Sequence, residues 1–236
     1  MLTLFSFLKK HLPADRAACF HYFNTHFYSK IRAPDSSASN SVMADRYENV
    51  RKWTNGVSLF DQKVVLIPIN LNAHWSLVAL LHPGVVCDDS DEDTNESPCL
   101  LFFDSLRIHN QRQIRKTIYQ YLALEWKTRK HSDRVFDETT FPCFTPNIPK
   151  QLNSYDCGVY VLLFGRLVLQ QFPFGSTKKQ IKDSFPVLCP TAFQYEDVKK
   201  FRDYLKQIVY LVRQLEKESP NRDVVLDDEI LDFEVI

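Results

Sequence analysis

One stretch of the sequence combines residue types that favour nucleophilic catalysis. Gln151 precedes Cys157 by six residues, and Gly158 and a long apolar segment follow. If that segment is a helix, the thiol lies at its N-terminus, where unpaired amides and the helix dipole favour the thiolate. Gly158 leaves room for a carbonyl group beside the sulfur, and the Gln151 carboxamide is placed to stabilise a developing oxyanion. The pattern predicts a nucleophile with an oxyanion donor.

Two further residues complete a candidate triad. His74 follows an Asn-rich turn and precedes a predicted strand, while Asp104 ends the next predicted strand. Neighbouring strand ends can bring the carboxylate to the imidazole, which fixes the ring and leaves its other nitrogen for the thiol. We therefore predict His74 as the base, Asp104 as the orienting acid and Cys157 as the nucleophile.

Each of these residues also has a structural interpretation. A free cysteine is usually a small, inert core residue, and an aspartate before a serine is often a turn former. A histidine at the start of a strand is often a satisfied structural group. Six other histidines compete for the role of base, at positions 11, 21, 26, 82, 109 and 131. His74 differs from them because Trp75 follows it in a turn-to-strand setting.

Composition bounds the class of protein. A chain of 236 residues with 44% hydrophobic residues is long enough for one substantial domain. Its 29 basic and 29 acidic residues give no global charge to attract nucleic acid or a membrane surface. The six cysteines form no Cys-x-x-Cys pair, so we expect no disulfide framework, no metal and no cofactor. No signal peptide or membrane-spanning run is evident, and we expect a soluble intracellular protein.

Hydrophobic periodicity predicts the elements around the candidate triad. Apolar runs bounded by turn residues predict strands, and apolar residues at helical spacing predict helices. A Ser-rich stretch at 33–41 is expected to be a mobile loop, and an acidic one at 88–96 a disordered insert. We predict strands at 63–69, 75–81 and 100–104, and helices at 2–12, 15–30, 46–53, 111–127, 158–172 and 197–218.

Three motifs together resemble the Ulp-type, sentrin-specific SUMO proteases. They are Ala-His-Trp-Ser-Leu at 73–77, Leu-Phe-Phe-Asp-Ser-Leu at 101–106, and Gln-Leu-Asn-Ser-Tyr-Asp-Cys-Gly-Val at 151–159. The resemblance extends to 23–28, to 50–54 and to the final helix, so it covers roughly residues 5–217. The insert, with the 104–107 and 121–126 segments, is similar to the branch that trims poly-SUMO chains.

The resemblance implies a fold, a chemistry and a partner. It implies the α+β papain-like cysteine protease fold, with a central mixed sheet flanked by helices and the nucleophile at the N-terminus of the central helix. It carries the base onto His74, the acid onto Asp104, the nucleophile onto Cys157 and the oxyanion donor onto Gln151. Trp75 would form one wall of a narrow tunnel that admits the diglycine tail of SUMO. The implied partners are SUMO and SUMO conjugates, for a nuclear, monomeric enzyme without nucleic-acid or membrane contacts.

The ends of the chain carry separate expectations. The catalytic domain is predicted at 1–219, with an acidic loop insert at 85–98 and an acidic tail at 220–236. The family usually has a Trp-containing segment ahead of the first helix that would form the opposite tunnel wall, and we expect the N-terminal end to be incomplete. The Val-Val-Leu-Asp-Asp-Glu-Ile run at 224–230 could add as a strand to SUMO, or be a disordered tail.

Two alternatives to a SUMO protease stay open from the sequence. The fold could serve a non-catalytic SUMO-binding module, although such a module commonly loses a member of its triad. The chain could also be a protease for another ubiquitin-like modifier such as NEDD8, since the residues do not reveal which modifier surface docks beside the diglycine tunnel.

Overall fold

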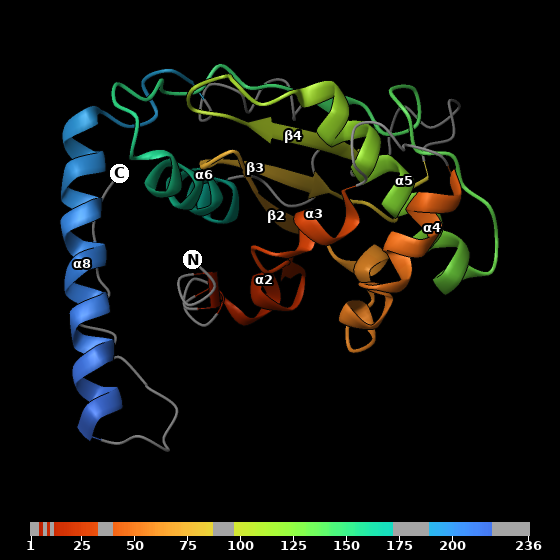
Figure 1. Cartoon of the computed structure of the whole chain (residues 1–236), viewed down its shortest axis with the longest axis horizontal. Helices are drawn as coiled ribbons and strands as arrows, with labels where there is room; N and C mark the ends of the chain where they lie inside the picture. Colours follow the sequence, from red (N-terminus) through yellow and green to blue (C-terminus); the bar gives the residue numbers. More distant parts are fainter. Residues whose placement is uncertain are drawn as a thin grey trace.

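A five-stranded mixed sheet forms the centre of the molecule (Figure 1). The computed structural model describes residues 5, 6, 9, 12–32, 40–86, 97–171 and 189–218. The strands run in the order β1-β2-β3-β4-β5; β2, β3 and β4 are antiparallel neighbours, and β1 and β5 add in parallel at the two edges. Their bounds are β1 Phe20–Tyr22, β2 Val64–Leu71, β3 His74–Leu81, β4 Cys99–Phe103 and β5 Cys143–Phe144.

Helices cover both faces of this sheet. In Figure 1, α6 and α8 lie to the left of the strands, and α4 and α5 lie to the right. Their bounds are α2 Ala14–Ala18, α3 Phe27–Ile31, α4 Asn40–Glu48, α5 Gln111–Lys130, α6 Cys157–Gln171 and α8 Tyr195–Glu218, with 3-10 turns η1 Arg51–Thr54 and η2 Leu59–Asp61. The chain therefore alternates between the sheet and its two helical layers.

The pleat of the strands divides the core into two clusters. Successive side chains of a strand point to opposite faces, and here both faces are buried. Leu66, Leu77, Ala79 and Phe103 pack with α6 and α8, whereas Val65, Ile67, Val78 and Phe102 pack with α3, α4 and α5. Burial on both faces explains why β2, β3 and β4 are nearly continuous apolar runs rather than alternating ones.

A tight hairpin places His74 at the first position of β3. Leu71 pairs with His74 across the antiparallel ladder, so the loop consists of Asn72 and Ala73 alone. Both loop residues have positive φ, 52° and 58°, as in the two-residue turn that matches strand twist. An alanine in this conformation costs about 1 kcal/mol, and the antiparallel pairing of β2 with β3 holds it there.

A buried glutamate ties α5 to α4 and η1, which lie between β1 and β2 in the chain. Glu125 is fully buried, and its carboxylate accepts hydrogen bonds from the Tyr47 hydroxyl and the Thr54 hydroxyl, each at 2.6 Å. Arg129, one turn later on α5, donates through Nε to the same carboxylate at 3.0 Å. Burial, together with the hydrogen bond to Glu125, raises the pKa of Tyr47 above its ordinary value. Three separate elements are thus joined through one charged group.

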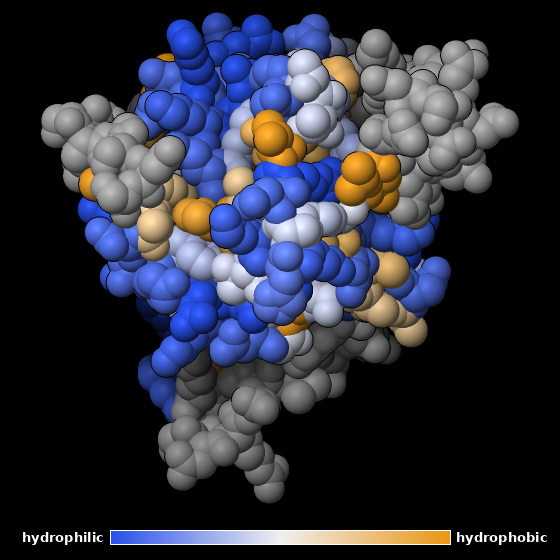
Figure 2. Space-filling view, turned by 90° about the vertical axis from the view of Figure 1, so that its right-hand side faces the viewer, coloured by the Kyte–Doolittle hydropathy of each residue, from blue (hydrophilic) through white to orange (hydrophobic). Residues whose placement is uncertain are grey.

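The surface on the α4 and α5 side is mostly hydrophilic. Figure 2 looks onto this side and shows isolated apolar patches within a polar surface. Within the described ranges, no helix combines the length and apolar character needed to cross a bilayer.

The central sheet and the longer helices agree with the predicted α+β class, but the N-terminal prediction was wrong. The single helix expected at 15–30 is instead α2, β1 and α3, because Phe20–Tyr22 pairs in parallel with Val64–Leu66. The helix expected at 46–53 is divided between α4 and η1, and α4 begins at Asn40 within the expected loop. The two-residue strand β5 was not predicted from the sequence.

Several expectations fall outside the described residues. They include most of the acidic insert, all of the 220–236 tail and most of the 2–12 segment, of which residues 5, 6 and 9 are helical. The domain boundary at 219 stays a prediction.

We predict that Glu125→Ala lowers the free energy of unfolding by about 3 kcal/mol, because it leaves buried hydroxyls and Arg129 without their acceptor. Urea denaturation at neutral pH measures the change. Glu48→Ala is the matched control, since Glu48 is 61% exposed and pairs with Arg51 at the surface; it should change stability by no more than about 0.5 kcal/mol. Equal losses in the two variants would contradict the anchoring role of Glu125.

Candidate active site

His74 and Asp104 form a buried pair where β3 begins and β4 ends. Nε2 of His74 lies 2.6 Å from Oδ1 of Asp104, and the side chains are 4% and 3% exposed. Antiparallel pairing of β3 with β4 accounts for this meeting, because the start of one strand lies beside the end of the other. The remaining ring nitrogen, Nδ1, is buried and has no hydrogen-bond partner among the described residues. This nitrogen is the one left for a nucleophile.

The Asp104 carboxylate also organises the loop that follows it. Oδ1 accepts the backbone amides of Leu106 and Arg107 at 3.1 and 3.0 Å, and Oδ2 accepts those of Ile108 and His109 at 3.0 and 2.9 Å. Burial alone would raise the pKa of Asp104, but the hydrogen bonds from the His109 amide and from His74 outweigh it and hold the pKa below its usual value. The carboxylate therefore stays ionised and able to orient the imidazole.

A second histidine packs against the first. The ring of His109 meets that of His74 edge-on, with centroids 4.6 Å apart. Its Nδ1 lies 2.7 Å from the Ser76 hydroxyl and its Nε2 lies 3.1 Å from the Leu71 carbonyl, so Nε2 carries the proton and Nδ1 accepts. Burial, followed by the nearby His74, lowers the pKa of His109. A neutral, doubly anchored ring thus supports the face of His74.

Cys157 is the first residue of α6 and lies beside the segment that carries His74. Cys157 is buried, and α6 begins with the amides of Val159 and Tyr160 donating to the Asp156 carbonyl at 2.8 and 3.0 Å. A Cβ placed on Gly158 would lie 3.8 Å from Cδ1 of Trp75. The indole next to His74 therefore borders the residue next to Cys157, and the histidine and cysteine segments meet at this corner of the fold.

Gln151 is fixed by the residue that follows Asp104. The Ser105 hydroxyl donates to Oε1 of Gln151 at 2.8 Å, and the Gln151 backbone amide donates to the Ser105 carbonyl at 3.1 Å. The hydroxyl thereby orients the carboxamide, whose nitrogen donates to the Asn153 carbonyl at 2.6 Å. Its other contact, with Oδ1 of Asn153, is long at 3.4 Å. The second N–H of Gln151 is thus weakly held and is the donor available to a ligand.

His74, Asp104 and His109 each carry an atom that could bind a metal ion, and these three atoms lie within 4.8 Å of one another. The hydrogen bonds already described use both Asp104 oxygens, both His109 nitrogens and Nε2 of His74. Hydrogen bonding therefore accounts for the closeness of these groups without a metal ion.

Comparison with known proteins identifies the fold around this site. Residues 3–215 match the Ulp1 protease family, C-terminal catalytic domain. The chain belongs to this family. A solved structure described as a de-sumoylating protease aligns with a TM-score of 0.59 and 26% identity, covering 98% of this chain and 83% of that one. The predicted family and its α+β papain-like fold are thereby confirmed.

Curated relatives are similar over much of the chain. Probable ubiquitin-like-specific protease 2A of Arabidopsis thaliana is 29% identical over 208 residues, which cover 86% of this chain and 27% of the relative. Sentrin-specific protease 2 of Homo sapiens is 32% identical over 162 residues, covering 68% of this chain and 23% of the relative. The chain thus spans about a quarter of the length of these relatives.

The structure joins some of the predicted residues by direct contacts, while no hydrogen bond between His74 and Cys157 is present among the described residues. His74 contacts Asp104, Trp75 borders Gly158, and Gln151 is held by Ser105. The support given by His109 was missed, although this histidine was among the competitors for the role of base. Its position five residues after Asp104, in the loop that the carboxylate organises, is the signal that could have found it.

We predict that Asp104→Asn lowers the free energy of unfolding by about 2 kcal/mol at pH 7, because an amide cannot accept all the hydrogen bonds that the carboxylate holds. The folded-state pKa of Asp104 lies below its unfolded value. Its stabilisation is therefore complete at neutral pH and is lost as the pH falls from about 5 through the folded-state pKa.

Urea denaturation between pH 3 and pH 7 tests how the stabilisation by Asp104 depends on pH. The difference between the wild-type protein and Asp104→Asn should shrink toward the acid end. Asp133→Asn is the control, because Asp133 is 84% exposed and pairs with Lys127 at the surface. A difference that stays constant with pH would show that the charge of Asp104 is not what stabilises the loop.

Proposed function

We propose that this chain is a SUMO-specific cysteine protease that cleaves after the C-terminal diglycine of SUMO, with Cys157, His74, Asp104 and Gln151 as its catalytic residues. The observation that carries the proposal is the buried His74–Asp104 pair. Nδ1 of His74 has no hydrogen-bond partner among the described residues, and the neighbouring Trp75 borders the start of α6. Membership of the Ulp1 protease family and the likeness to a de-sumoylating protease support SUMO as the substrate.

In the first half of the reaction, the Cys157 thiolate attacks the carbonyl carbon of the terminal glycine in an isopeptide bond. The carbon–sulfur bond forms as the carbonyl π electrons move to oxygen, and the second N–H of Gln151 and the first amides of α6 stabilise that oxyanion. The carbon–nitrogen bond then breaks, and the His74 imidazolium gives its proton to the departing lysine amine. A SUMO thioester on Cys157 remains.

In the second half, neutral His74 takes a proton from water. The hydroxide attacks the thioester carbon, the carbon–sulfur bond breaks with its electrons returning to sulfur as the thiolate beside the imidazolium, and the SUMO carboxylic acid loses its proton to water as it leaves. Throughout the cycle, Asp104 steadies the imidazolium through Nε2, and its lowered pKa keeps it anionic while the ring is charged.

Trp75 is proposed as the residue that selects the diglycine tail. A Cβ added to Gly158 would lie 3.8 Å from Cδ1 of its indole, so the indole borders the residue after the nucleophile, and we propose that a tail passing between them must lack side chains. Exposed apolar side chains on the flanking loops, Ile108, Leu152 and Tyr155, offer contact surface for a protein substrate.

The branch, the partners and the location belong to the same proposal. SUMO-conjugated proteins and SUMO chains are the proposed substrates. The resemblance of the acidic insert and of the 104–107 and 121–126 segments to the chain-trimming branch supports a chain-trimming role. A nuclear, monomeric enzyme is proposed from the family resemblance, and a fluorescent fusion excluded from nuclei would contradict that location.

A SUMO vinyl-sulfone probe tests the activity directly. The wild-type protein should form one covalent adduct at Cys157 under reducing conditions, because the thiolate adds to the vinyl group in place of the carbonyl. Cys157→Ser should bind SUMO but form no adduct and cleave no di-SUMO. An unlabelled wild-type protein that still binds SUMO would identify a non-catalytic binding module, and faster labelling by a NEDD8 probe would identify a different modifier.

We predict that Trp75→Ala weakens the discrimination between tails. SUMO substrates ending in Gly-Gly and in Gly-Ala are compared by kcat/KM. Removing the indole should lower kcat/KM for the Gly-Gly substrate about tenfold and bring the ratio of the two substrates closer to one, because the wall that rejects a methyl group is gone. A thermal melt checks that the variant is folded. An unchanged ratio would remove Trp75 from the selecting role.

A further inference from the structure

The nucleophile follows a buried acidic residue. Asp156 immediately precedes Cys157 and is 1% exposed. An unpaired carboxylate in that position would oppose the formation of a thiolate, because two negative charges would lie close together at low dielectric. The charge of Asp156 therefore calls for a cationic counterpart, and neither the turn 153–156 nor the first turn of α6 contains a lysine or an arginine.

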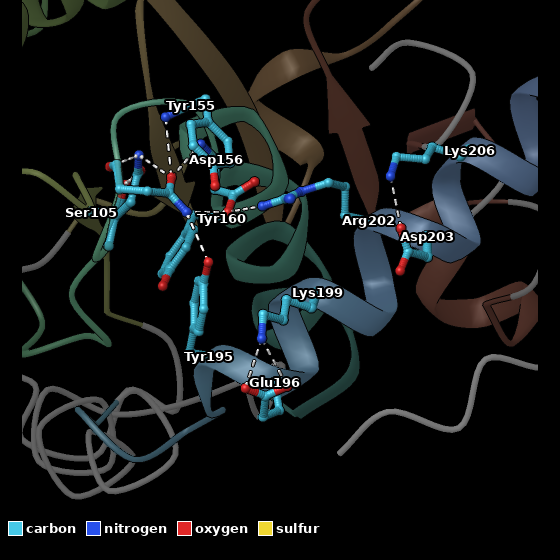
Figure 3. A network of polar contacts seen from close by, with 12 residues as sticks. Ser105, Tyr155, Asp156, Tyr160, Tyr195, Glu196, Lys199, Arg202, Asp203 and Lys206 are labelled. Carbon is cyan, nitrogen blue, oxygen red and sulfur yellow. Dashed lines mark hydrogen bonds and ion pairs between the residues drawn. The ribbon is translucent and has the colours of Figure 1, made fainter.

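Arg202 on α8 supplies that charge. Its Nη2 donates to Oδ2 of Asp156 in an ion pair, and the arginine side chain is 26% exposed. The guanidinium also stacks over the exposed Tyr155 ring, with its centre 5.0 Å from the ring centroid. Burial opposes the charged form of Arg202, but the bond to Asp156 outweighs it and raises the pKa of the arginine. Figure 3 shows the arginine reaching from α8 across to the turn before α6.

The turn before Cys157 is held by its own hydrogen bonds and by a second residue of α8. Asn153 accepts the amides of Tyr155 and Asp156 through Oδ1 at 3.1 and 3.0 Å, and donates through Nδ2 to Oδ2 of Asp156 at 2.6 Å. The same Nδ2 lies 3.4 Å from the hydroxyl of Tyr195, at the start of α8. Two residues of α8 thus contact the four-residue turn 153–156.

This arrangement also keeps the start of α6 open. Oδ2 of Asp156 accepts from Asn153 and Arg202, and among the described residues no amide of α6 donates to the Asp156 carboxylate. The aspartate side chain therefore does not cap the helix in the usual way. The amides of Cys157 and Gly158, unlike those of Val159 and Tyr160 that donate to the Asp156 carbonyl, are thus left for the oxyanion.

We propose that Arg202 is a positioning residue for the nucleophile: by pairing with Asp156 it neutralises the carboxylate beside Cys157 and fixes the turn that presents the sulfur. The inference rests on the proposed function, because it assumes that Cys157 is the nucleophile. The reactivity of the thiol is then set in part by α8, which follows the nucleophile by about 40 residues in the sequence.

The test is the pH dependence of Cys157 alkylation in the full chain, followed by peptide mass spectrometry to separate Cys157 from the other cysteines. In Arg202→Met, the midpoint of the rate–pH curve should move upward by about 1 pH unit, because the unpaired carboxylate disfavours the thiolate. The kcat for SUMO cleavage should fall about tenfold, with KM changed less than twofold. Arg213→Met, at an exposed position on the same helix, should leave both quantities unchanged.

A compensating substitution separates charge from structure. Asp156→Asn combined with Arg202→Met removes the unpaired carboxylate, so the alkylation midpoint should return to the wild-type value while kcat stays reduced. A midpoint that remains raised in the double variant would overturn the electrostatic role of Arg202.

Two outcomes distinguish the failure of this inference from that of the proposed function. If wild-type Cys157 does not react with the SUMO probe, the proposed function fails. If it reacts and Arg202→Met keeps the wild-type midpoint and kcat, only the inference fails. Should Arg202→Met not fold, Arg202→Lys decides. Lysine keeps the positive charge but lacks the planar guanidinium that pairs with Asp156 and stacks on Tyr155. The alkylation midpoint should therefore stay at the wild-type value, and kcat should fall several-fold. An unchanged kcat would overturn the positioning role.

Discussion

A single carboxylate, that of Asp104, holds the active-site corner together. It accepts hydrogen bonds from Nε2 of His74 and from the four backbone amides of residues 106–109. A buried anion without such partners would be unstable, so the loop must wrap around it, and the wrapped loop delivers Ser105 to Gln151 and His109 to the face of His74. The placement of His74 as the proposed base, of His109 as its support and of Gln151 as the proposed oxyanion donor follows from satisfying one charge at the end of β4.

The sheet explains why that charge lies where it does. Both faces of β2, β3 and β4 are buried by helices, which fixes the strand register because a slip of one residue would exchange the two cores. The tight Asn72-Ala73 hairpin then fixes His74 as the first residue of β3. Ala73, in the left-handed conformation, lies directly before His74, so the strained residue of the hairpin adjoins the candidate site.

The parts of this design that repeat along the chain were predictable from sequence, and the parts that join distant residues were not. The apolar runs of β2, β3 and β4 and the periodicity of α5 and α8 carry their own signal. β1 was mistaken for part of a helix because three residues, including His21 and Tyr22, show no period and exist as a strand only through parallel pairing with β2. The Ser105–Gln151 and Asp156–Arg202 contacts each join residues 46 positions apart, which no local pattern reveals.

The start of α6 must satisfy two opposing demands. An acidic residue before a helix is favoured by the dipole, and the same dipole favours a thiolate on the next residue; yet carboxylate and thiolate repel each other. Arg202 reconciles them, because an ion pair with Asp156 leaves the turn nearly neutral while the helix terminus stays positive. The exposed ion pairs of α8, Lys199–Glu196 and Lys206–Asp203, each join two residues of α8 itself (Figure 3). Of these charged groups, Arg202 directs its charge at the turn 153–156, which is how α8 would influence the chemistry proposed for Cys157 on another helix.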